Sequence, residues 1–359
     1  MKVAKVYTYP IKSLRAFETP SAEVTRHGFA YDRHFMLLKV LRDDDNPSKP
    51  SYKNMAVAYF PECVLFFPSI LFPPSSTLED KPQGKIRVDF RPPASSGREA
   101  RSIEIPLTPD VSGLDEIEVD MHRSPTRGYR MDEDVCKWFS DCFGYEVVLA
   151  YLGGNRRGVK MTTSSDVRYT TASAATAPGG FLSSILSKAS EAILGCAAEA
   201  NQQEEITFAD CAPYLVVSEK SMDDIHRRLP DNEKMDITKF RPNIIVSGAE
   251  KQWEEDYWGE VTFSNDIRME CAQNCARCQS INIDYATGRA GEGEAGKMLK
   301  KLQSDRRVDP GMKYSPVFGR YSFLHPSSEG ATIKVGDEVA VTRKNEEKTR
   351  FDWEGICTK

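Results

Sequence analysis

Residues 85–121 read KIRVDFRPPASSGREARSIEIPLTPDVSGLDEIEVDM, and their pattern indicates the fold class of the whole chain. Polar and apolar residues alternate over three short runs, which is typical of strands that bury one face: Lys85–Phe90, Ser102–Ile105 and Glu116–Met121. Proline and glycine separate the runs, at Pro92, Pro93, Pro106, Pro109 and Gly113. Short strands between such turns predict a β-sandwich or a β-barrel.

The same pattern continues on both sides of this stretch. Further strands are expected over Lys2–Tyr9, Phe35–Val40, Cys63–Phe67 and Glu146–Tyr151. A short helix is expected over residues 134–143, because four apolar residues recur there at helical spacing: Val135, Trp138, Phe139 and Cys142. We therefore expect residues 1–150 to form an N-terminal β-domain.

Strands and helices mix in the second part of the chain, residues 206–345. Strands are expected over Tyr214–Ser218, Ile244–Ser247, Glu260–Phe263, Ser280–Tyr285, Pro316–Leu324 and Thr332–Val341. Helices are expected over Ser221–Leu229 and Gly296–Leu302. Few of the strands are joined by the helices that a parallel sheet requires. A β-rich α+β chain therefore fits better than a doubly wound sheet.

Residues 151–205 differ in composition from the sequence around them. Gly153–Gly180 is rich in Gly, Ser, Thr and Ala, and Phe181–Ala200 repeats apolar residues at helical spacing. We expect an inserted loop and a helix that either lies on the surface or docks a partner. The charged residues Arg343–Lys359 predict a loose tail, with residues 346–359 beyond the second domain.

Composition excludes several classes of protein. The 359 residues carry 48 Lys+Arg and 53 Asp+Glu, a net charge of −5, which argues against a nucleic-acid partner. With 40% hydrophobic residues the chain can bury a core. No apolar run approaches the roughly 18–20 residues of a membrane span, and the N-terminus lacks the apolar segment of a signal peptide. We expect a cytoplasmic protein without a membrane span; a mitochondrial association stays open, although no anchor is seen.

Three of the nine cysteines, Cys271, Cys275 and Cys278, lie close together. The odd count and wide scatter of the nine argue against a disulfide framework. The spacing of the three suits an iron–sulfur or zinc site, but no fourth Cys or His lies within thirty residues on either side. A thioredoxin-like dithiol would open a helix, whereas a strand-like segment follows Cys278. Two readings stay open: one thiolate that binds a metal beside Arg277, or three small buried residues.

Polar and charged residues stand at the ends of several expected strands. They are Lys12 and Ser13, Arg33, and Arg241 and Asn243. Each cation alone is commonly solvated, but several that converge suit a phosphate group, which Arg grips with two hydrogen bonds and Lys as a point charge. Asp210, just before an apolar strand, is by itself an ordinary turn residue.

Taken together, these motifs resemble the MOSC-domain family, which is named for the C-terminal domain of molybdenum-cofactor sulfurases, and most of all its mitochondrial amidoxime-reducing branch. The resemblance covers nearly the whole chain. It is carried by YPIKS (9–13), GFAYDR (28–33), FRPNIIV (240–246), CARC (275–278), DYATG (284–288), PVFG (316–319) and IKVGD (333–337). It implies an N-terminal MOSC β-barrel-like domain and a MOSC β-barrel domain with peripheral helices.

The resemblance also implies a bound molybdenum cofactor, the metal held by a pterin with a phosphate tail. Cys278 then matches the cysteine ligand of the metal, and Asp210 an acidic residue beside it. The remaining matches are contacts to the pterin and its phosphate: Lys12, Ser13, Arg33, Arg241, Asn243 and Arg277. The residue chemistry agrees independently, because a soft thiolate suits such a metal and Lys and Arg suit a phosphate.

The activity implied is the reduction of N-oxygenated compounds such as N-hydroxylated amidines, with Cys278 and Asp210 as catalytic residues. Asp210 would act as proton donor or substrate positioner if the site raises its pKa. No redox module and no pyridoxal-phosphate-dependent domain is seen, so electrons should come from a separate protein, such as a cytochrome b5 with its reductase.

Three residues depart from the family pattern. Cys211 and Ala212 stand where relatives have a hydroxyl residue after the aspartate, and Ala276 where a serine often precedes the Arg-Cys pair. An alternative function, from another class, is a non-catalytic carrier of the cofactor or of its sulfur, with a persulfide on Cys278. A degenerate scaffold is a third reading, motivated by Ala212 and Ala276.

Overall fold

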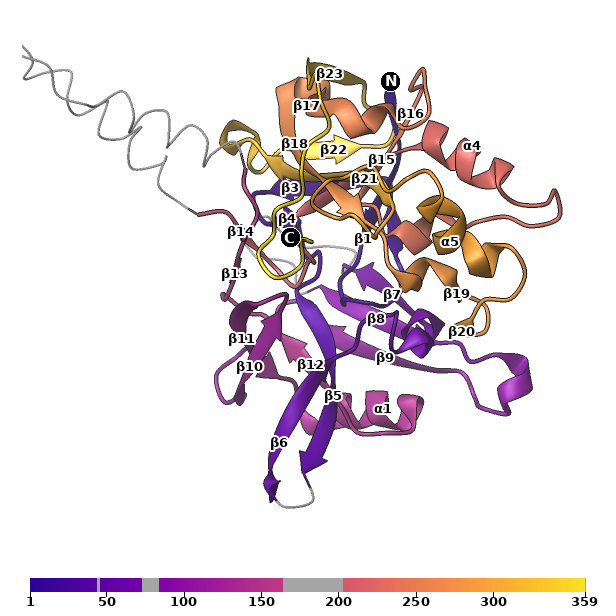
Figure 1. Cartoon of the computed structure of the whole chain (residues 1–359). Helices are drawn as coiled ribbons and strands as arrows, with labels where there is room; N and C mark the ends of the chain where they lie inside the picture. The colour runs from indigo at the N-terminus through magenta and orange to yellow at the C-terminus, as the bar shows by residue number, and fades with distance from the viewer. Residues whose placement is uncertain (44–45, 73–83, 164–202, 359) are drawn as a thin grey trace, which may run out of the picture.

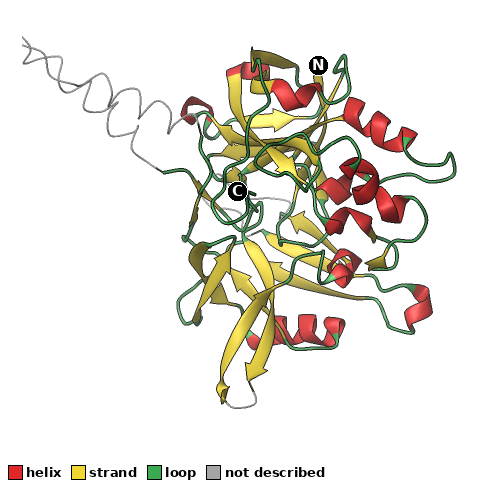
Figure 2. Cartoon of the chain, in the orientation of Figure 1, coloured by secondary structure: helices red, strands yellow, loops and turns green. Residues whose placement is uncertain are grey.

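The computed structural model describes residues 1–43, 46–72, 84–163 and 203–358. Strands dominate this part of the chain, and the helices lie mostly on the outside (Figure 2). Two β-rich bodies lie against each other, and the C-terminus ends between them (Figure 1). The fold is β-rich α+β, as the sequence predicts.

The first body, the N-terminal barrel, is built on an antiparallel sheet in the order β10-β11-β12-β5-β6. Its strands are Glu116–Met121 (β10), Ser124–Arg130 (β11), Val147–Tyr151 (β12), Phe35–Asp43 (β5) and Asn46–Asn54 (β6). The side chain of Asn54 donates a 2.7 Å hydrogen bond to the carbonyl of Asp120. Because this bond connects the two edge strands, the sheet forms a nearly closed barrel.

A smaller sheet and one helix complete this body. They comprise β7 (Phe66–Leu71), β8 (Lys85–Phe90), β9 (Arg101–Pro106) and α1 (Glu133–Phe143). Helix α1 ends at Gly144, whose φ of 83° lets its N–H bond the carbonyl of Ser140 at 2.7 Å. The buried face of the helix packs on the small sheet, where the ring of Phe143 lies 4.6 Å from that of Phe66.

The second body is built on an eight-stranded sheet, the large sheet, in the order β2-β1-β16-β15-β21-β18-β17-β23. Its strands are Phe17–Thr19 (β2), Lys2–Thr8 (β1), Ile244–Ser247 (β16), Tyr214–Ser218 (β15), Val317–Leu324 (β21), Ile267–Ala276 (β18), Trp258–Phe263 (β17) and Val339–Lys344 (β23). All neighbours are antiparallel except β15 and β16, which are parallel and are joined through helix α4 (Glu219–Arg227).

The remaining elements are short. The strands are Ser21–Thr25 (β3), Gly28–Phe29 (β4), Arg157–Gly158 (β13), Glu205–Ile206 (β14), Ile283–Asp284 (β19), Arg289–Ala290 (β20) and Thr332–Lys334 (β22). The α-helix is Met298–Gln303 (α5). The 3₁₀ turns are Pro61–Leu65 (η1), Ala94–Ser96 (η2), Ile237–Phe240 (η3), Glu254–Tyr257 (η4), Ser264–Asp266 (η5), Gln279–Asn282 (η6), Ala295–Lys297 (η7) and Pro326–Ser328 (η8).

The first residues of the chain belong to the large sheet and not to the N-terminal barrel. Strand β1 pairs with β16, with Lys2 opposite Ser247. Just after β1, Ile11 forms a bridge with Phe35 at the start of β5. The segment that carries Lys12 and Ser13 therefore lies at the junction of the two bodies.

Two expected strands are wrong because local turns form there. A strand is expected over Cys63–Phe67, but Pro61–Leu65 form the turn η1, since Pro61 fixes the first φ of that turn. The strand β7 begins only at Phe66. The strand expected over Ser280–Tyr285 is mostly the turn η6, and only Ile283–Asp284 pair in β19.

Two further expectations need correction. The strand expected over Thr332–Val341 is two strands, β22 and β23, because Gly336 turns the chain with a φ of 95°. The loose tail is also wrong: Phe351 and Trp353 are 2% and 0% exposed and pack in a core with Ile206. Burial of the two apolar side chains holds this segment against the protein, although charged residues surround them in the sequence.

The helix expected over Phe181–Ala200 lies outside the described residues. Among the described residues no helix is both long and apolar enough to cross a membrane.

Candidate functional site

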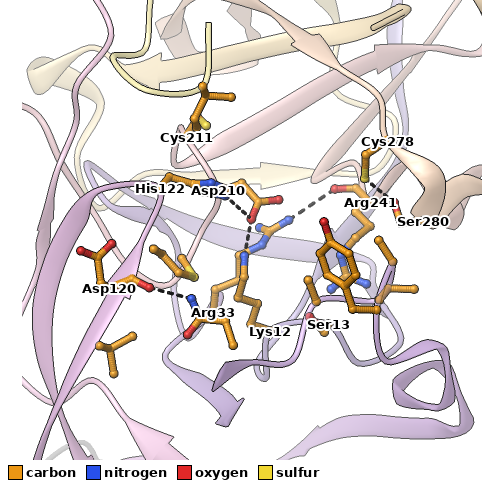
Figure 3. Close-up of a pocket in the computed structure, with 18 of the residues that line it drawn as sticks. Lys12, Ser13, Arg33, Asp120, His122, Asp210, Cys211, Arg241, Cys278 and Ser280 are labelled. Carbon is orange, nitrogen blue, oxygen red and sulfur yellow. Dashed lines mark hydrogen bonds and ion pairs between the residues drawn. The ribbon is translucent and has the colours of Figure 1, made fainter. Parts of the chain in front are cut away.

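A cleft of about 1110 Å³ opens between the N-terminal barrel and the large sheet. Strands β5 and β6 and the β10–β11 hairpin line one wall, and the segments around Asp210, Arg241 and Cys278 line the other. Figure 3 shows His122 of the hairpin next to Asp210. Seven of the residues singled out from the sequence line it: Lys12, Ser13, Arg33, Asp210, Arg241, Arg277 and Cys278. Asn243 lines a smaller adjoining cavity of about 80 Å³. The structure therefore brings all the expected site residues together.

Cys278 presents its thiol to this cleft, just after strand β18 ends at Ala276. The thiol is exposed, and Sγ lies 3.3 Å from Oγ of Ser280. Cys271 and Cys275 are 1% and 4% exposed on β18, and burial raises the pKa of both thiols. Of the three clustered cysteines, Cys278 alone offers an accessible sulfur. This contradicts the reading of three small buried residues and leaves a single thiolate as a candidate metal ligand.

Arg277 holds the loop that carries Cys278. Its Nε donates to the carbonyl of Phe318 at 2.9 Å, and its Nη1 donates to the carbonyl of Phe240 at 2.7 Å. Its own N–H donates to the carbonyl of Pro316 at 2.8 Å. The guanidinium is therefore largely occupied by backbone carbonyls, so Arg277 fixes the shape of the loop as well as lining the cleft.

Two guanidinium groups lie over the ring of Tyr9, at the end of β1. The Cζ atoms of Arg33 and Arg241 lie 4.6 Å and 4.5 Å from the ring centroid. The Tyr9 hydroxyl donates to the carbonyl of Pro242 at 3.1 Å. Such cation–π contacts place two positive charges side by side, and Asp32, which bonds Arg33, offsets only part of that charge.

Asn243 is a buried cross-link. Its Oδ1 accepts from Nη1 of Arg33 and from the N–H of Leu215, both at 3.2 Å, and its Nδ2 donates to the carbonyl of Tyr7 at 3.3 Å. These bonds connect β1, β15 and the residues before β16. Asn243 therefore sets the position of Arg33 at the cleft.

Three of these residues have left-handed backbone conformations, which favour glycine. The φ angles are 72° at Ser13, 56° at Arg33 and 57° at Arg241. Backbone hydrogen bonds hold two of them, from Arg33 to Tyr9 at 2.8 Å and from Arg241 to Thr238 at 3.0 Å. Such strain costs of order 1 kcal/mol per residue and is concentrated at functional sites.

Lys12 and Asp210 form an ion pair at the centre of the cleft, with Nζ donating to Oδ1. Burial alone would raise the pKa of Asp210, but Lys12 and His122 outweigh it, so the pKa lies well below the ordinary 3.8. Burial lowers the pKa of Lys12, and the charge of Asp210 opposes that shift. The condition under which Asp210 could donate a proton is not met: it is a carboxylate at neutral pH.

Two domain models match this chain. The model described as the MOSC N-terminal beta barrel domain matches residues 1–146, and the model described as the MOSC domain matches residues 203–340. Together they cover most of the sequence. The chain belongs to the MOSC-domain family.

Curated relatives of this MOSC protein match it over part of their length. It is 36% identical over 141 residues to the mitochondrial amidoxime-reducing component 1 of Homo sapiens, which is 38% of this chain and 39% of the relative. It is 37% identical over 142 residues to the mitochondrial amidoxime reducing component 2 of Rattus norvegicus, with shares of 38% and 39%. It is 32% identical over 145 residues to the molybdenum cofactor sulfurase of Arabidopsis thaliana, with shares of 38% and 17%. The matched stretch thus spans about two-fifths of the amidoxime-reducing relatives.

The residues of this MOSC site fit a pterin–molybdenum group with a phosphate. Nη1 of Arg241 donates to the carbonyl of Leu14 at 2.9 Å, whereas its Nη2 is buried without a hydrogen bond in the described part of the chain. A buried unused donor on a cation suits a phosphate oxygen. The accessible sulfur of Cys278 suits the metal. No group of three or more His, Cys, Asp or Glu that could hold a metal ion occurs among the described residues.

The departures from the family pattern lie beside this site. Cys211 is 4% exposed and lines the cleft, and burial raises the pKa of its thiol. Ala212 is buried, and Ala276 ends β18 next to Arg277. The thiol of Cys211 is only a weak hydrogen-bond donor, and the methyl groups of Ala212 and Ala276 form no hydrogen bond, so none of the three replaces a hydroxyl. Backbone groups are then the remaining donors at these positions.

Three residues that sequence reasoning missed belong to the site: Tyr9 below Arg33, His122 beside Asp210, and Trp353, whose Nε1 donates to the carbonyl of His122 at 2.8 Å. Tyr9 stands in the YPIKS motif, so a signal existed. His122 and Trp353 had none, because their importance comes from partners far along the chain.

Proposed function

We propose that this MOSC protein binds a molybdenum cofactor and reduces N-oxygenated compounds such as N-hydroxylated amidines. The observation that carries the proposal is the accessible thiol of Cys278 at a cleft that Lys12, Arg33 and Arg241 make electropositive. The names of the matched relatives support the same substrate class.

The division of roles follows from the contacts. Cys278 would supply the protein ligand to the metal. Arg241, with its unused buried nitrogen, would bind the phosphate, Arg33 would add a second positive charge beside it, and Ser13 also lines the cleft. Arg277 and Asn243 would position the residues that bind the cofactor and not bind it themselves, because their polar groups are already bonded to the protein.

Removal of one oxygen from an N-hydroxylated compound as water takes two electrons and two protons. When bound, the molybdenum cofactor supplies the redox centre through which the electrons reach the N–O bond. Asp210 is a carboxylate whose side chain is 53% exposed, so it can accept a hydrogen bond from an N–H or O–H of the substrate. Its role is therefore to orient the substrate and not to protonate it.

The electrons should come from a separate one-electron carrier protein, and a cytochrome b5 with its reductase is the donor we propose to test. A cytoplasmic location stays a prediction, since the relatives named above are described as mitochondrial.

The deciding test is the molybdenum content of the purified full chain, made in a host that supplies the eukaryotic form of the cofactor. We expect close to one molybdenum per chain in the wild type, loss in Cys278→Ala, and no loss in Cys357→Ala, a control at a partly exposed cysteine. The wild type should also reduce an N-hydroxylated benzamidine with an added electron donor. A well-folded wild type without molybdenum would overturn the proposal and favour a carrier of sulfur or a degenerate scaffold.

A further inference from the structure

His122 lies opposite the Lys12–Asp210 ion pair, on the wall formed by the N-terminal barrel. It is the first residue of the two-residue turn between β10 and β11, and its Nε2 lies 3.6 Å from Oδ1 of Asp210 (Figure 3). Its side chain is 39% exposed and lines the cleft. Of the five histidines, all of which the structure describes, His122 alone lines the cleft.

The turn that carries this ring is unfavourable for its sequence. His122 and Arg123 have φ angles of 57° and 60°, and Met121 pairs with Ser124 across the turn. Two-residue hairpin turns of this kind prefer Asn and Gly, because both central residues need a positive φ. A turn made of His and Arg therefore depends on other parts of the fold to hold it.

Arg157 supplies one of these supports. It is 0% exposed, and its guanidinium donates to carbonyls on both sides of the turn: to Met121 at 2.8 Å and to Ser124 at 3.2 Å. It also donates to the carbonyl of Ala209 at 2.5 Å, next to Asp210. Burial lowers the pKa of Arg157 to about 10. One buried cation thus fixes the backbones of both members of the His122–Asp210 pair.

Trp353 supplies the second support, from the C-terminal segment that follows the matched MOSC domain. Its Nε1 donates to the carbonyl of His122 at 2.8 Å, and its ring is fully buried. The neighbouring Asp352 accepts from the N–H of Thr162 at 3.0 Å and from Nε2 of Gln273 on β18 at 2.6 Å. The segment therefore connects the turn to the large sheet.

We propose that His122 delivers a proton to the oxygen that leaves the substrate, with Arg157 and Trp353 as positioning residues that hold its ring against Asp210. This inference rests on the proposed function. The reduction needs a proton donor on the cleft, and Asp210 is a carboxylate there. The ring faces the Lys12–Asp210 ion pair on the opposite wall.

The N–O bond breaks with two electrons from the external carrier protein, given in two one-electron transfers. The oxygen, which already carries its hydroxyl proton, takes one proton from the His122 imidazolium and leaves as water, and the nitrogen takes the second proton from solvent. Solvent then reprotonates the half-exposed ring. Imidazole side chains contribute factors of about 100 to 10,000 in rate through proton transfer of this kind.

The first experiment compares His122→Gln with His226→Gln, a control on α4 outside the cleft, in the cofactor-loaded full chain. We expect kcat to fall about 100-fold in His122→Gln, with KM and molybdenum content near those of the wild type, and added imidazole to restore part of the rate. A kcat within twofold of the wild type would overturn the inference. A wild type with neither molybdenum nor activity would instead overturn the proposed function, so the two failures are distinct.

The second experiment tests the positioning without the cofactor. Ring ¹⁵N NMR signals of His122, assigned by their loss in His122→Gln, should shift in Trp353→Phe, which keeps a ring but lacks the N–H donor. They should stay unchanged in Trp138→Phe, a control in α1. Arg157→Lys should shift the signals too. If Arg157→Lys fails to fold, Trp353→Phe alone tests the positioning. Unchanged signals in folded Trp353→Phe would contradict the positioning.

Discussion

Lys12 and Asp210 form an ion pair between the loop after β1 and the segment before β15, at the junction of the two β-rich bodies. Lys12 is nearly buried, whereas Asp210 is half-exposed to the cleft. Because each body supplies part of the site, neither body alone has the arrangement on which the proposed chemistry depends. The pair also makes the stability of the junction depend on pH.

Replacing Asp210 by Asn should destabilise the protein more at neutral than at acidic pH. The folded pKa of Asp210 lies below its ordinary 3.8, so its stabilisation is present above about pH 4 and is lost as the pH falls through the folded pKa. Since the carboxyl is half-exposed, we expect a loss of about 1 kcal/mol near neutral pH and a smaller loss near pH 3, where the unfolded carboxyl is already mostly protonated.

Urea unfolding of the wild type and of Asp210→Asn at both pH values measures this difference. Glu18→Gln is the control, because its ion pair with Lys5 is exposed at both ends and should matter little at either pH. An Asp210→Asn effect of the same size at both pH values would contradict the ion-pair account.

Replacing Arg241 by Gln should weaken cofactor retention without unfolding the chain. The change removes the cation and the unused Nη2, so one charge-assisted hydrogen bond to the phosphate is lost, worth about 1.5–3 kcal/mol or a 10- to 100-fold weaker affinity. Pterin fluorescence after dialysis measures the retained cofactor. Arg87→Gln, at an exposed position of β8, is the control and should retain it fully. Equal cofactor retention in both variants would contradict the assignment of Arg241 as a phosphate-binding residue.

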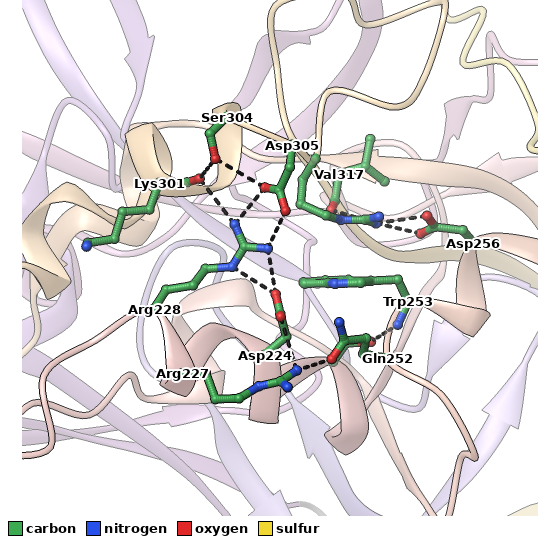
Figure 4. A network of polar contacts seen from close by, with 12 residues as sticks. Asp224, Arg227, Arg228, Gln252, Trp253, Asp256, Lys301, Ser304, Asp305 and Val317 are labelled. Atoms are coloured by element: carbon green, nitrogen blue, oxygen red, sulfur yellow. Dashed lines mark hydrogen bonds and ion pairs between the residues drawn. The ribbon is translucent and has the colours of Figure 1, made fainter.

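Glu255→Gln should remove a pH dependence of stability that lies outside the cleft. Glu255 is fully buried, and burial raises its pKa to about 7. The next residue, Asp256 (Figure 4), pairs with the guanidinium of Arg306. Oε2 of Glu255 accepts from Oγ of Ser221 at 2.8 Å, and Oε1 of Glu255 has no hydrogen bond in the described part of the chain. The folded state therefore holds a proton that the unfolded chain releases near 4.5.

It follows that stability decreases as the pH rises from about 4.5 to about 7 and is level above that, by about 1.4 kcal/mol for each unit of pKa difference. Unfolding free energies across this range should decline in the wild type and stay flatter in Glu255→Gln. The exposed Glu250→Gln should behave as the wild type. A parallel decline in the Glu255 variant would show that another group is responsible.

The sequence predicts strands best where alternation or an apolar run is bounded by turn residues. The bounds of β8, β10, β15 and β16 agree with the expectation residue for residue. Strand β18 was missed because it carries Gln273 and Asn274 at buried positions. Their polar groups are bonded to Asp352 and to Arg320, partners that no local pattern reveals.

The same distinction applies to the site. Lys12, Arg33 and Arg241 were found because they stand in short motifs at strand ends, and the fold then brings them into one cleft. Their cofactor roles stay predictions. His122 could not be found, since it faces Asp210 only once the hairpin and the C-terminal segment are in place.

A substitution of Trp353 tests whether the C-terminal segment is packed on the protein or is a loose tail. Trp353 is fully buried, so Trp353→Ala should cost about 3–5 kcal/mol of unfolding free energy, because it leaves a large cavity and an unpaired carbonyl at His122. Tyr314→Ala, at a side chain 71% exposed, should change the free energy by less than about 0.5 kcal/mol. Urea unfolding measures both. If the two substitutions cost the same, the segment does not pack on the hairpin, and the support proposed for His122 is lost with it.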